Sequence, residues 1–450
     1  MVTPLASAVL LVGCTSTVGG ENPDGVGISA VSVEPAEFAP SVLVVRWTTR
    51  LAATSRVEVS LDDEIVAAVE DAALTTEHEL RVQGLKAGRD YQIVAASEVG
   101  VERESSAAVA VAAEAAPSWV PALVVSEVDA SRHEGGFVLM SVGNQAESGA
   151  VLVDRDGDVV WWAFAGADRL STASVVRRDG KAVLFASQQR AMDGAEGAIL
   201  EVALDGSSAR THPAPGLHHA FTELADGSLA YLAVDIRDFE GEAVIGDTVV
   251  VVDDAGEVRE VFNAWDHIVP SAFCSHYEPV PYAAGAVDWL HANSLALVPG
   301  GNTLLVMARN ADALLEVDPA TGEIGLQISG AASADPFDHG HYSQLTADGI
   351  LMMDNGPHRT PPASRAVEYR VDRDAGTIAL TWAYWEPEGR HVVALGDVKK
   401  LVGGNRLVSW STAGLVTEVA DQDVVWQLAA GLGSSTGWVS HVPTLAGAVQ

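Results

Sequence analysis

The sequence predicts an all-β protein in which a six-bladed β-propeller follows a smaller β-sandwich. Apolar, strand-like runs that close on Asp and a Gly turn recur from about residue 118 onward. No part of that region shows the periodicity of an amphipathic helix. A separate group of strand-like segments within residues 29–115 predicts the sandwich.

The propeller prediction depends on an internal repeat. Each copy reads as a strand, a Gly turn, a second strand, an apolar segment ending in Asp, another Gly turn and a last apolar strand. The closing residues are Asp154, Asp205, Asp253, Asp318, Asp372 and Asp421. Their spacing runs from 48 residues, between Asp205 and Asp253, to 65 residues, between Asp253 and Asp318. An isolated four-stranded sheet cannot bury both faces, whereas blades round an axis can, so residues 118–450 are expected to form six blades.

Residues 29–115 carry the features of a β-sandwich. Val42–Trp47 is a β-branched apolar run, and Arg56–Leu61 alternates as a half-buried strand does. The spacing Leu85-x-x-Gly88-x-x-Tyr91 resembles the tyrosine corner of fibronectin type III and immunoglobulin-like sandwiches. Trp47 is then the expected core tryptophan, and the domain is expected to be a spacer or a buttress.

Residues 1–14 are predicted to be a lipoprotein signal. A short apolar run ends at Cys14, and Leu11-Val12-Gly13-Cys14 resembles a bacterial lipobox. Met1–Pro4 carries no Lys or Arg, so an ordinary apolar N-terminus with a chance cysteine is the alternative. Residues 15–28 are polar and Gly-rich, which predicts a flexible tether.

An acylated Cys14 would be the only membrane attachment, because no apolar run long enough to cross a bilayer occurs elsewhere. The protein is then expected outside the cytoplasm, anchored by lipid to the cell envelope, at the outer membrane or in the periplasm. The sequence leaves the oligomeric state open, with a homodimer as one expectation.

Composition excludes some partners. The formal net charge is −35, which argues against nucleic acid or an anionic membrane surface. An anionic substrate would need a local cationic pocket. Two cysteines give no disulfide framework.

Histidines recur at one place in the repeat. His219, Asn293 and His341 each lie eight residues before a turn glycine, and His291 lies two residues before Asn293. Equivalent positions on successive blades converge, so three imidazoles are expected to meet at the axis. A structural role is the alternative for any one histidine. The next copy, Leu395-Gly396-Asp397, is expected to offer no side chain there.

Metal binding is a rival interpretation of these histidines, because three imidazoles could hold zinc. Arg309 follows the apolar strand 304–308, however, and a guanidinium there favours an anion over a metal. Asp154–Asp158 resembles the start of a calcium loop but lacks the downstream Glu and flanking helices, so a blade turn is expected. No metal and no cofactor are therefore predicted.

The histidine segments resemble a known family. Asp288-Trp289-x-His291-x-Asn293-Ser294, with Arg309 after the next strand, is similar to the bacterial arylsulfate sulfotransferases. The segments 351–356, 364–369 and 401–405 extend the resemblance over about residues 130–430. That family also has an N-terminal β-sandwich before a six-bladed propeller.

The resemblance implies a sulfuryl transfer from an aryl sulfate to a phenol through a sulfohistidine, without a nucleotide sulfate donor. His341 matches the nucleophile. His219, His291 and Arg309 match residues that hold sulfate oxygens, and Asn293 matches a nearby polar residue. The chemistry agrees, since a neutral imidazole is a competent nucleophile and cationic donors stabilise the oxygens.

Two further residues are candidate substrate contacts. Trp289 could line an aryl pocket or pack in the core, and His339 is a second histidine beside the nucleophile. The chain departs from the family at Gly340, where Gln is usual, and at Cys274, which stands alone where the family has a cysteine pair.

Two other functions are weighed. The first is a catalytically inactive, surface-anchored propeller that binds small ligands or protein partners, because fold does not determine function. The second is a quinone- or metal-dependent oxidoreductase, for which no motif is present.

Overall fold

The computed structural model describes residues 25–450 except 145, 190–195, 271–284, 347–348, 432–434 and 446–450. The regular secondary structure of the described residues is almost entirely β-strand, with one short α-helix, α1 (Ala264–His267). The predicted signal and Cys14 lie outside the described residues and stay predictions, as does most of the tether. No described helix has the length and apolar character needed to cross a membrane.

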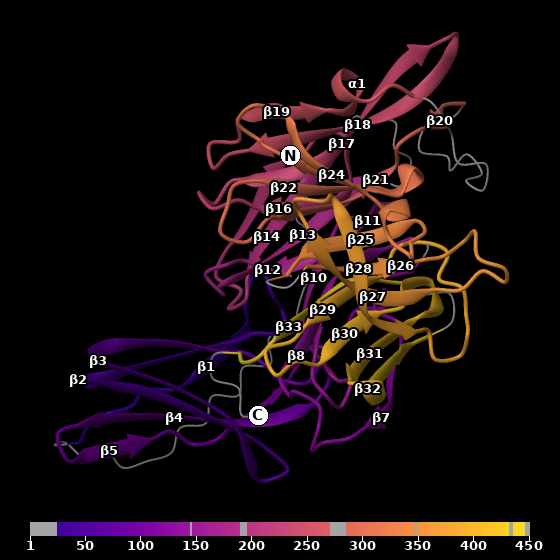
Figure 1. The fold of residues 1–450 in the computed structure, drawn as a ribbon. Coiled ribbons are helices and arrows are strands. Elements are labelled where there is room, and N and C mark those ends of the chain that lie inside the picture. The colour runs from indigo at the N-terminus through magenta and orange to yellow at the C-terminus, as the bar shows by residue number, and fades with distance from the viewer. Residues whose placement is uncertain are drawn as a thin grey trace.

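The N-terminal part is a six-stranded antiparallel sheet with its own apolar core (indigo in Figure 1). Its strands are β1 (Ser32–Pro35), β2 (Leu43–Leu61), β3 (Glu64–Val82), β4 (Asp90–Val99), β5 (Glu102–Ser105) and β6 (Val109–Ala112). β2 pairs with β1 in its first half and with β4 in its second. Tyr91 lies in the core, and its hydroxyl accepts a hydrogen bond from Lys86 N at 2.8 Å, as a tyrosine corner does. Trp47 is buried and donates to Ser97 Oγ at 2.9 Å.

Six sheets follow, which we call blades 1 to 6, and all their strand pairs are antiparallel except the short pair of β18 with β20 in blade 3. Blade 1 holds β8 (Phe137–Gly143), β9 (Ser148–Val153), β10 (Val159–Phe164) and β33 (Ser435–Val442). Blade 2 holds β11 (Arg169–Leu170), β12 (Ser174–Val176), β13 (Ala182–Gln189), β14 (Gly197–Ala203) and β15 (Ala209–Pro213). Blade 3 holds β16 (Leu217–Glu223), β17 (Leu229–Phe239), β18 (Glu242–Val252), β19 (Val258–Asn263) and the short β20 (Val287–Asp288).

The remaining three blades are built in the same way. Blade 4 holds β21 (Ala292–Leu297), β22 (Leu304–Ala308), β23 (Ala313–Val317) and β24 (Ile324–Ser329). Blade 5 holds β25 (Gly340–Leu345), β26 (Ile350–Asp354), β27 (Arg365–Asp372) and β28 (Thr377–Trp385). Blade 6 holds β29 (Asp397–Lys400), β30 (Arg406–Ser409), β31 (Leu415–Ala420), β32 (Asp423–Ala430) and β7 (Leu123–Val128). Three single turns of 3-10 helix, η1 (Arg309–Ala311), η2 (Gly330–Ala332) and η3 (Ser411–Ala413), lie between strands.

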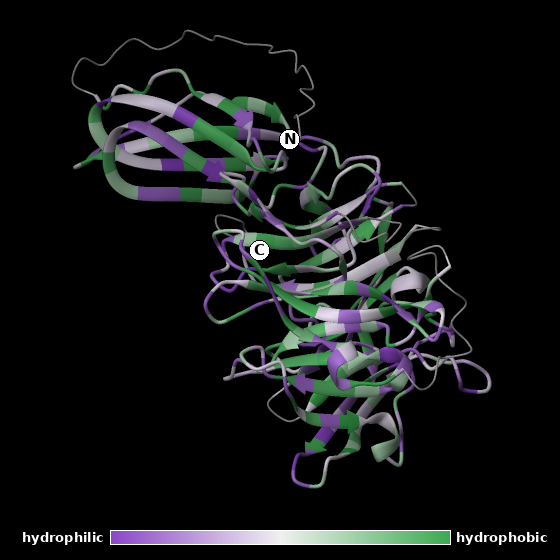
Figure 2. Cartoon of the chain, turned by 90° about the horizontal axis from the view of Figure 1, so that it is seen from above, coloured by the Kyte–Doolittle hydropathy of each residue, from purple (hydrophilic) through white to green (hydrophobic). Residues whose placement is uncertain are grey.

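The blades form a closed circuit. Contacts run round the ring from β33 to β12 in blade 2, from β13 of blade 2 to β16, then through β21, β25 and β29, and β29 contacts β33 again. Both ends of the region help to close it, because β33 pairs with β8 in blade 1 and β7 pairs with β32 in blade 6. This is the arrangement expected of a six-bladed propeller, with one end of each innermost strand near a common axis. Hydrophobic stretches run along strands of both parts, and hydrophilic stretches occur on strands as well as in turns (Figure 2).

A lysine joins the N-terminal sheet to blade 1. Lys86 Nζ lies 3.1 Å from Asp154 Oδ2, 2.7 Å from Asp156 Oδ2 and 2.8 Å from Asp158 Oδ2. These carboxylates belong to the turn between β9 and β10, as the sequence predicted. The turn resembles a calcium loop because its three carboxylates converge. Here they converge on the ammonium group of Lys86, which lies where a calcium ion would bind.

A buried ion pair joins blades 6 and 1. Glu418 in β31 is fully buried, and its Oε2 lies 2.8 Å from Arg155 Nη1 in the β9–β10 turn. Glu418 Oε1 accepts from Asn405 Nδ2 at 2.7 Å, and the Arg155 guanidinium lies over the Trp426 ring at 4.9 Å. The contact between blades 6 and 1, which are distant in sequence, thus involves one buried carboxylate.

Glu418→Ala should lower the free energy of unfolding by about 3–5 kcal/mol, because it leaves the buried Arg155 without its carboxylate. Urea unfolding followed by circular dichroism measures the loss. The matched control is Glu388→Ala, which removes an exposed carboxylate from an ion pair with Arg390 and should cost about 1 kcal/mol or less. Equal losses in both variants would contradict the role given to Glu418.

Candidate active site

Three innermost strands carry a bulge at or beside a predicted site residue. His341 pairs with Met353, the fourth residue of β26, and a bulge separates this pair from Gln344–Leu351. Asn293 lies in the bulge between the pairs Ala292–Ala308 and Ser294–Met307. His219 lies in the bulge between Leu217–Ala233 and Phe221–Tyr231. Bulges re-aim side chains, so blades 3, 4 and 5 each bring a polar side chain to one level of the axis.

The backbone is unusual at the histidines themselves. His219, His291 and His339 have φ angles of 52°, 51° and 56°. A non-glycine residue in this left-handed region is uncommon. All three are nevertheless buried, so the surrounding structure holds them in a costly conformation, as is typical of functional sites.

The histidines and Arg309 form one electrostatic group. The rings of His219 and His291 lie 4.8 Å apart between centroids. Burial and the nearby charge of His291 hold the pKa of His219 well below its ordinary value, with smaller effects from His341 and Arg309. Burial, then Arg309 and His291, lower the pKa of His341. Burial and Arg309 do the same to the pKa of His291. The imidazoles are therefore neutral near pH 7 and feel the fixed charge of the Arg309 guanidinium.

Blade 5 also shows why residue 340 is small. Gly340 precedes His341, and a Cβ placed on it would lie 2.6 Å from Met307 Cε in blade 4. A longer side chain here requires Met307 to move. Gly340 stands where the resembling family usually has glutamine. Its small size allows blades 4 and 5 to pack closely at this point.

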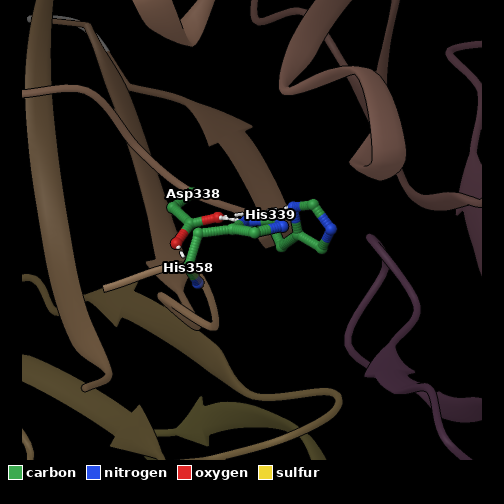
Figure 3. Close-up of side chains that lie close together, drawn as sticks. All are labelled: Asp338, His339 and His358. Carbon is green, nitrogen blue, oxygen red and sulfur yellow. Dashed lines mark hydrogen bonds and ion pairs between the residues drawn. The ribbon is translucent and has the colours of Figure 1, made fainter. Parts of the chain in front are cut away.

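The predicted substrate contacts lie in three different settings. Asn293 Nδ2 donates to Gly340 O at 3.0 Å, which joins blades 4 and 5. Its Oδ1 is buried and makes no hydrogen bond among the described residues. Trp289 is buried against Trp265 at 5.1 Å between ring centroids, which agrees with a core role. His339 lies against Asp338 and His358 (Figure 3).

Arg309 is tied to the histidine motif from behind. It begins η1, is 4% exposed, and its backbone N–H donates to His291 O at 3.3 Å. Its Nη1 donates to Asn310 Oδ1 at 2.9 Å, and Asn310 Nδ2 donates to Asp288 O and Trp289 O, both at 3.3 Å. Asn310 therefore aligns the guanidinium with the segment that carries His291, as the motif spacing predicted.

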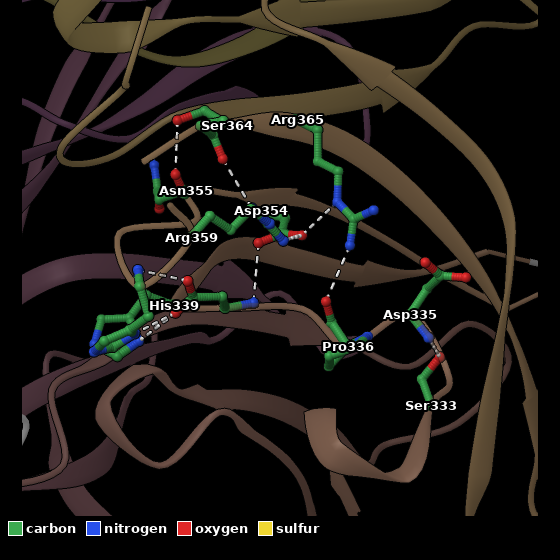
Figure 4. Close-up of polar contacts among 12 residues, drawn as sticks. Ser333, Asp335, Pro336, His339, Asp354, Asn355, Arg359, Ser364 and Arg365 are labelled. Carbon is green, nitrogen blue, oxygen red and sulfur yellow. Dashed lines mark hydrogen bonds and ion pairs between the residues drawn. The ribbon is translucent and has the colours of Figure 1, made fainter. Parts of the chain in front are cut away.

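An amide fixes the tautomer of His341. Asn355 Nδ2 donates to Val392 O at 2.8 Å and to Leu395 O at 3.2 Å, so this atom is the amide nitrogen. Asn355 Oδ1 is then the acceptor that contacts His341 Nδ1. Nδ1 carries the proton, and Nε2 keeps its lone pair. Ser364 Oγ holds the loop by donating to Asn355 O at 2.7 Å (Figure 4).

Two buried carboxylates stand behind the other imidazoles. His291 Nδ1 lies 2.5 Å from Asp288 Oδ2, and burial raises the pKa of Asp288 to about 6. His218 Nε2 lies 3.2 Å from Asp247 Oδ1, and His218 Nδ1 lies 3.0 Å from His219 Nδ1. Each carboxylate can stabilise an imidazolium when its histidine takes a proton.

Sequence reasoning missed several of these residues. His218, Asp247 and Asn355 were not proposed as site residues, and Asp288 was noted only as part of a motif. A carboxylate inside the apolar strand β18 was the available signal for Asp247, since an unpaired buried charge is costly. Nothing local identifies Asn355, whose partner His341 is 14 residues away.

Blade 6 corrects one expectation. Asp397 is fully buried and pairs with Ser409, the fourth residue of β30. His341 likewise pairs with Met353, the fourth residue of β26. Its Oδ2 accepts from Val439 N at 3.0 Å and lies 3.5 Å from Lys399 Nζ. The Lys399 ammonium lies 3.5 Å from the centre of the Tyr342 ring. Burial lowers the pKa of Lys399 to about 8. This blade therefore does bring a polar side chain to the axis.

The open space at the site is small. A cavity of about 10 Å³ is lined by His218, His219, Val234, Ile245, Asp247, Asp288 and His291. That is room for about one water molecule, so a sulfuryl group requires the lining side chains to move. A larger hollow of about 640 Å³ lies at the turns around Gly300 and Arg178, and no histidine lines it.

Comparison with known proteins finds one family that matches part of the chain. Residues 123–335 match the family described as Arylsulfotransferase (ASST). The matched segment includes His219, His291, Asn293 and Arg309, and it ends before His341. No curated protein matches the chain.

Solved structures resemble the chain only distantly. A protein of unknown function from Bacteroides caccae is 14% identical, with 66% of this chain and 95% of that one covered and a TM-score of 0.40. An auxiliary nutrient binding protein from Bacteroides ovatus is 11% identical, with 90% and 86% covered and a TM-score of 0.36. Likenesses at this level carry no argument about function.

The buried histidines should make stability depend on pH. Folding lowers the pKa of His219 and His291, so below about pH 6.5 the unfolded chain binds protons that the folded chain does not. The free energy of unfolding should therefore fall as the pH is lowered from 7.5 to 6. Urea unfolding at several pH values measures the slope. His219→Gln should make it shallower and His267→Gln, at an exposed position, should not; an unchanged slope in His219→Gln would contradict this.

Proposed function

We propose that the chain moves a sulfuryl group from an aryl sulfate to a phenol through an adduct on His341, which the match of residues 123–335 to the arylsulfotransferase family supports. The observation that carries the proposal is the convergence of His219, His291 and Arg309 beside a histidine whose tautomer is fixed. A buried cationic group of this kind also answers the charge problem, since the chain as a whole repels anions.

The first half-reaction uses the Nε2 lone pair of His341. This nitrogen attacks sulfur, an N–S bond forms, and the bond between sulfur and the aryl oxygen breaks with its electron pair leaving on the phenolate. The imidazole ring becomes positively charged, and Asn355 Oδ1 stabilises that charge at Nδ1. The low pKa of His341 keeps the nucleophile unprotonated at neutral pH.

Arg309 and the other histidines act on the oxygens. The guanidinium supplies fixed donors to the sulfuryl oxygens, whose charge spreads in the transition state. A bound anion raises the pKa of neighbouring imidazoles, so His291 can take a proton at Nε2 while Asp288 holds Nδ1–H. His291 is then placed to protonate the leaving phenolate.

The second half-reaction reverses these steps. An acceptor phenol gives its proton to neutral His291, and its oxygen attacks the sulfur of the adduct. The N–S bond breaks, and His341 regains its lone pair. Donor and acceptor thus use the same site in turn, which gives ping-pong kinetics.

A propeller that binds ligands without chemistry is the second candidate. The small cavity favours it, because about 10 Å³ does not admit a sulfuryl group without movement. Saturable binding of an aryl sulfate without release of phenol would support this alternative.

Removing the nucleophile tests the proposal. His341→Ala should lower phenol release from a chromogenic aryl sulfate by roughly 10³-fold or more, since residues that act as a unit lose nearly all catalysis together. The assay contains a phenolic acceptor and follows the released phenol. His133→Ala, at a histidine in the loop before blade 1, is the matched control and should keep full activity. Equal activity in His341→Ala and the parent would refute the adduct mechanism.

Asn355 should act as a positioning residue. Asn355→Ala should lower kcat by roughly 10- to 100-fold, because Nδ1 loses its acceptor and the tautomer is no longer fixed. Asn355→Asp keeps an acceptor and adds a negative charge, which raises the pKa of His341.

The pH profile distinguishes this from a structural role. In Asn355→Asp, the acid limb of the kcat/KM profile should move to higher pH, because His341 must be neutral to attack. A lower rate in both variants with an unmoved acid limb would show that Asn355 only supports the loop.

A further inference from the structure

We propose that Asp338, His339 and His358 bind a divalent transition-metal ion of the zinc class beside the histidine site. His358 Nδ1 lies 2.6 Å from Asp338 Oδ1, and His339 Nδ1 lies 3.4 Å from the same oxygen. Figure 3 shows the Asp338 carboxylate next to both imidazoles. The three ligand atoms all lie within 4.8 Å of one another. The cluster adjoins the histidine site, since His339 is two residues from His341, but it shares no residue with His219, His291 and His341. A metal titration therefore tests it without any sulfuryl transfer.

The spacing suits such an ion. Zinc takes imidazole nitrogen and carboxylate oxygen at about 2.0–2.2 Å, so ligand atoms on neighbouring corners of its tetrahedron lie roughly 3.3–3.5 Å apart. His339 Nδ1 and Asp338 Oδ1, 3.4 Å apart, already have this separation. His358 Nδ1 and Asp338 Oδ1, 2.6 Å apart, would have to move slightly apart. The two rings meet nearly edge-on, with 77° between their planes.

A fourth ligand is within reach. Asp312 Oδ1 lies 3.3 Å from His339 Nδ1 and accepts a hydrogen bond from His339 N at 2.6 Å. Two imidazoles and one or two carboxylates are the ligands of zinc and similar ions, whereas calcium and magnesium prefer oxygen alone. His358 is 37% exposed, which gives an ion access from solvent, and His339 is 2% exposed.

Hydrogen bonds hold the ligands before any ion arrives. Asp338 N donates to Asp354 Oδ1 at 2.9 Å, and His358 N donates to Asp338 Oδ2 at 2.8 Å. Asp354 is itself held by Arg365 Nε at 2.7 Å and by Arg359 (Figure 4). Such support behind the ligands is what a metal site requires.

The other acidic cluster in the described residues serves as a built-in comparison. Asp154, Asp156 and Asp158 also lie close enough to share an ion. Lys86 Nζ lies within 3.1 Å of all three, so its ammonium group already occupies the place that a shared metal ion would take. We therefore expect one ion per chain at the Asp338 cluster and none at the Asp154 turn.

The position of the ion gives it a structural consequence. Asp312 follows η1, which begins at Arg309, and His339 is two residues from His341. An ion on these ligands would join the segments that carry the guanidinium and the candidate nucleophile. It should therefore raise the melting temperature of the chain.

The test uses the full chain without a histidine tag, freed of metal with a chelator. Zn²⁺ is titrated by calorimetry, and bound zinc is counted by elemental analysis after gel filtration. We expect one zinc per chain and a higher melting temperature. His358→Ala, which removes an exposed side chain, and Asp338→Asn should each weaken binding by roughly 10-fold or more. Asp156→Asn is the matched control and should bind as the parent does.

Three outcomes would overturn the proposal: no saturable zinc uptake, uptake that His358→Ala leaves unchanged, or uptake that only Asp156→Asn removes. If Asp338→Asn fails to fold, His358→Ala alone decides, and its circular dichroism spectrum verifies that it is folded.

Discussion

The hydrogen bond between His341 and Asn355 is the contact on which the proposed chemistry depends. Two backbone carbonyls, of Val392 and Leu395, decide which atom of the Asn355 amide is nitrogen, and so decide which nitrogen of His341 carries the proton. If the amide were turned round, Nδ1 of His341 would hold the lone pair. Nδ1 contacts Asn355, so that lone pair would not be available to attack a substrate. Loops of blades 5 and 6 thus set the reactivity of one imidazole, and Ser364 holds those loops together.

The propeller supplies the rest by bringing separate blades to one axis. His219 and Asn293 lie in bulges of blades 3 and 4, and His341 lies beside a bulge of blade 5. These bulges bring the three side chains together. Burial makes all these imidazoles less basic, and Arg309 supplies the only permanent positive charge among them. Buried Asp288 and Asp247 can stabilise protonated histidines when an anion enters, so the imidazoles are neutral while the site is empty and can become cationic when it is occupied.

The fold and the convergence of the histidines could be predicted because both follow a repeat. Asp at the end of each apolar run marked the blades, and the distance from His219, Asn293 and His341 to a turn glycine matched their level in the strands. The supporting contacts could not be predicted. The partners of Asn355, and the contact of Lys86 with the Asp154 turn, join segments that no local pattern connects. Asp397 was overlooked because the innermost strand of blade 6 is shorter than those of blades 3, 4 and 5. The expected distance from the turn glycine therefore falls at Leu395 and Gly396, before Asp397.

The most direct test of the account is to find the sulfuryl group on the protein. The chain is incubated with an aryl sulfate alone, quenched at alkaline pH, digested and examined by mass spectrometry. The account predicts a mass increase of one sulfuryl group on the peptide that contains His341, lost on addition of a phenol and absent from His341→Ala. An adduct on His339, His291 or His219 instead, or release of phenol without any adduct, would contradict it.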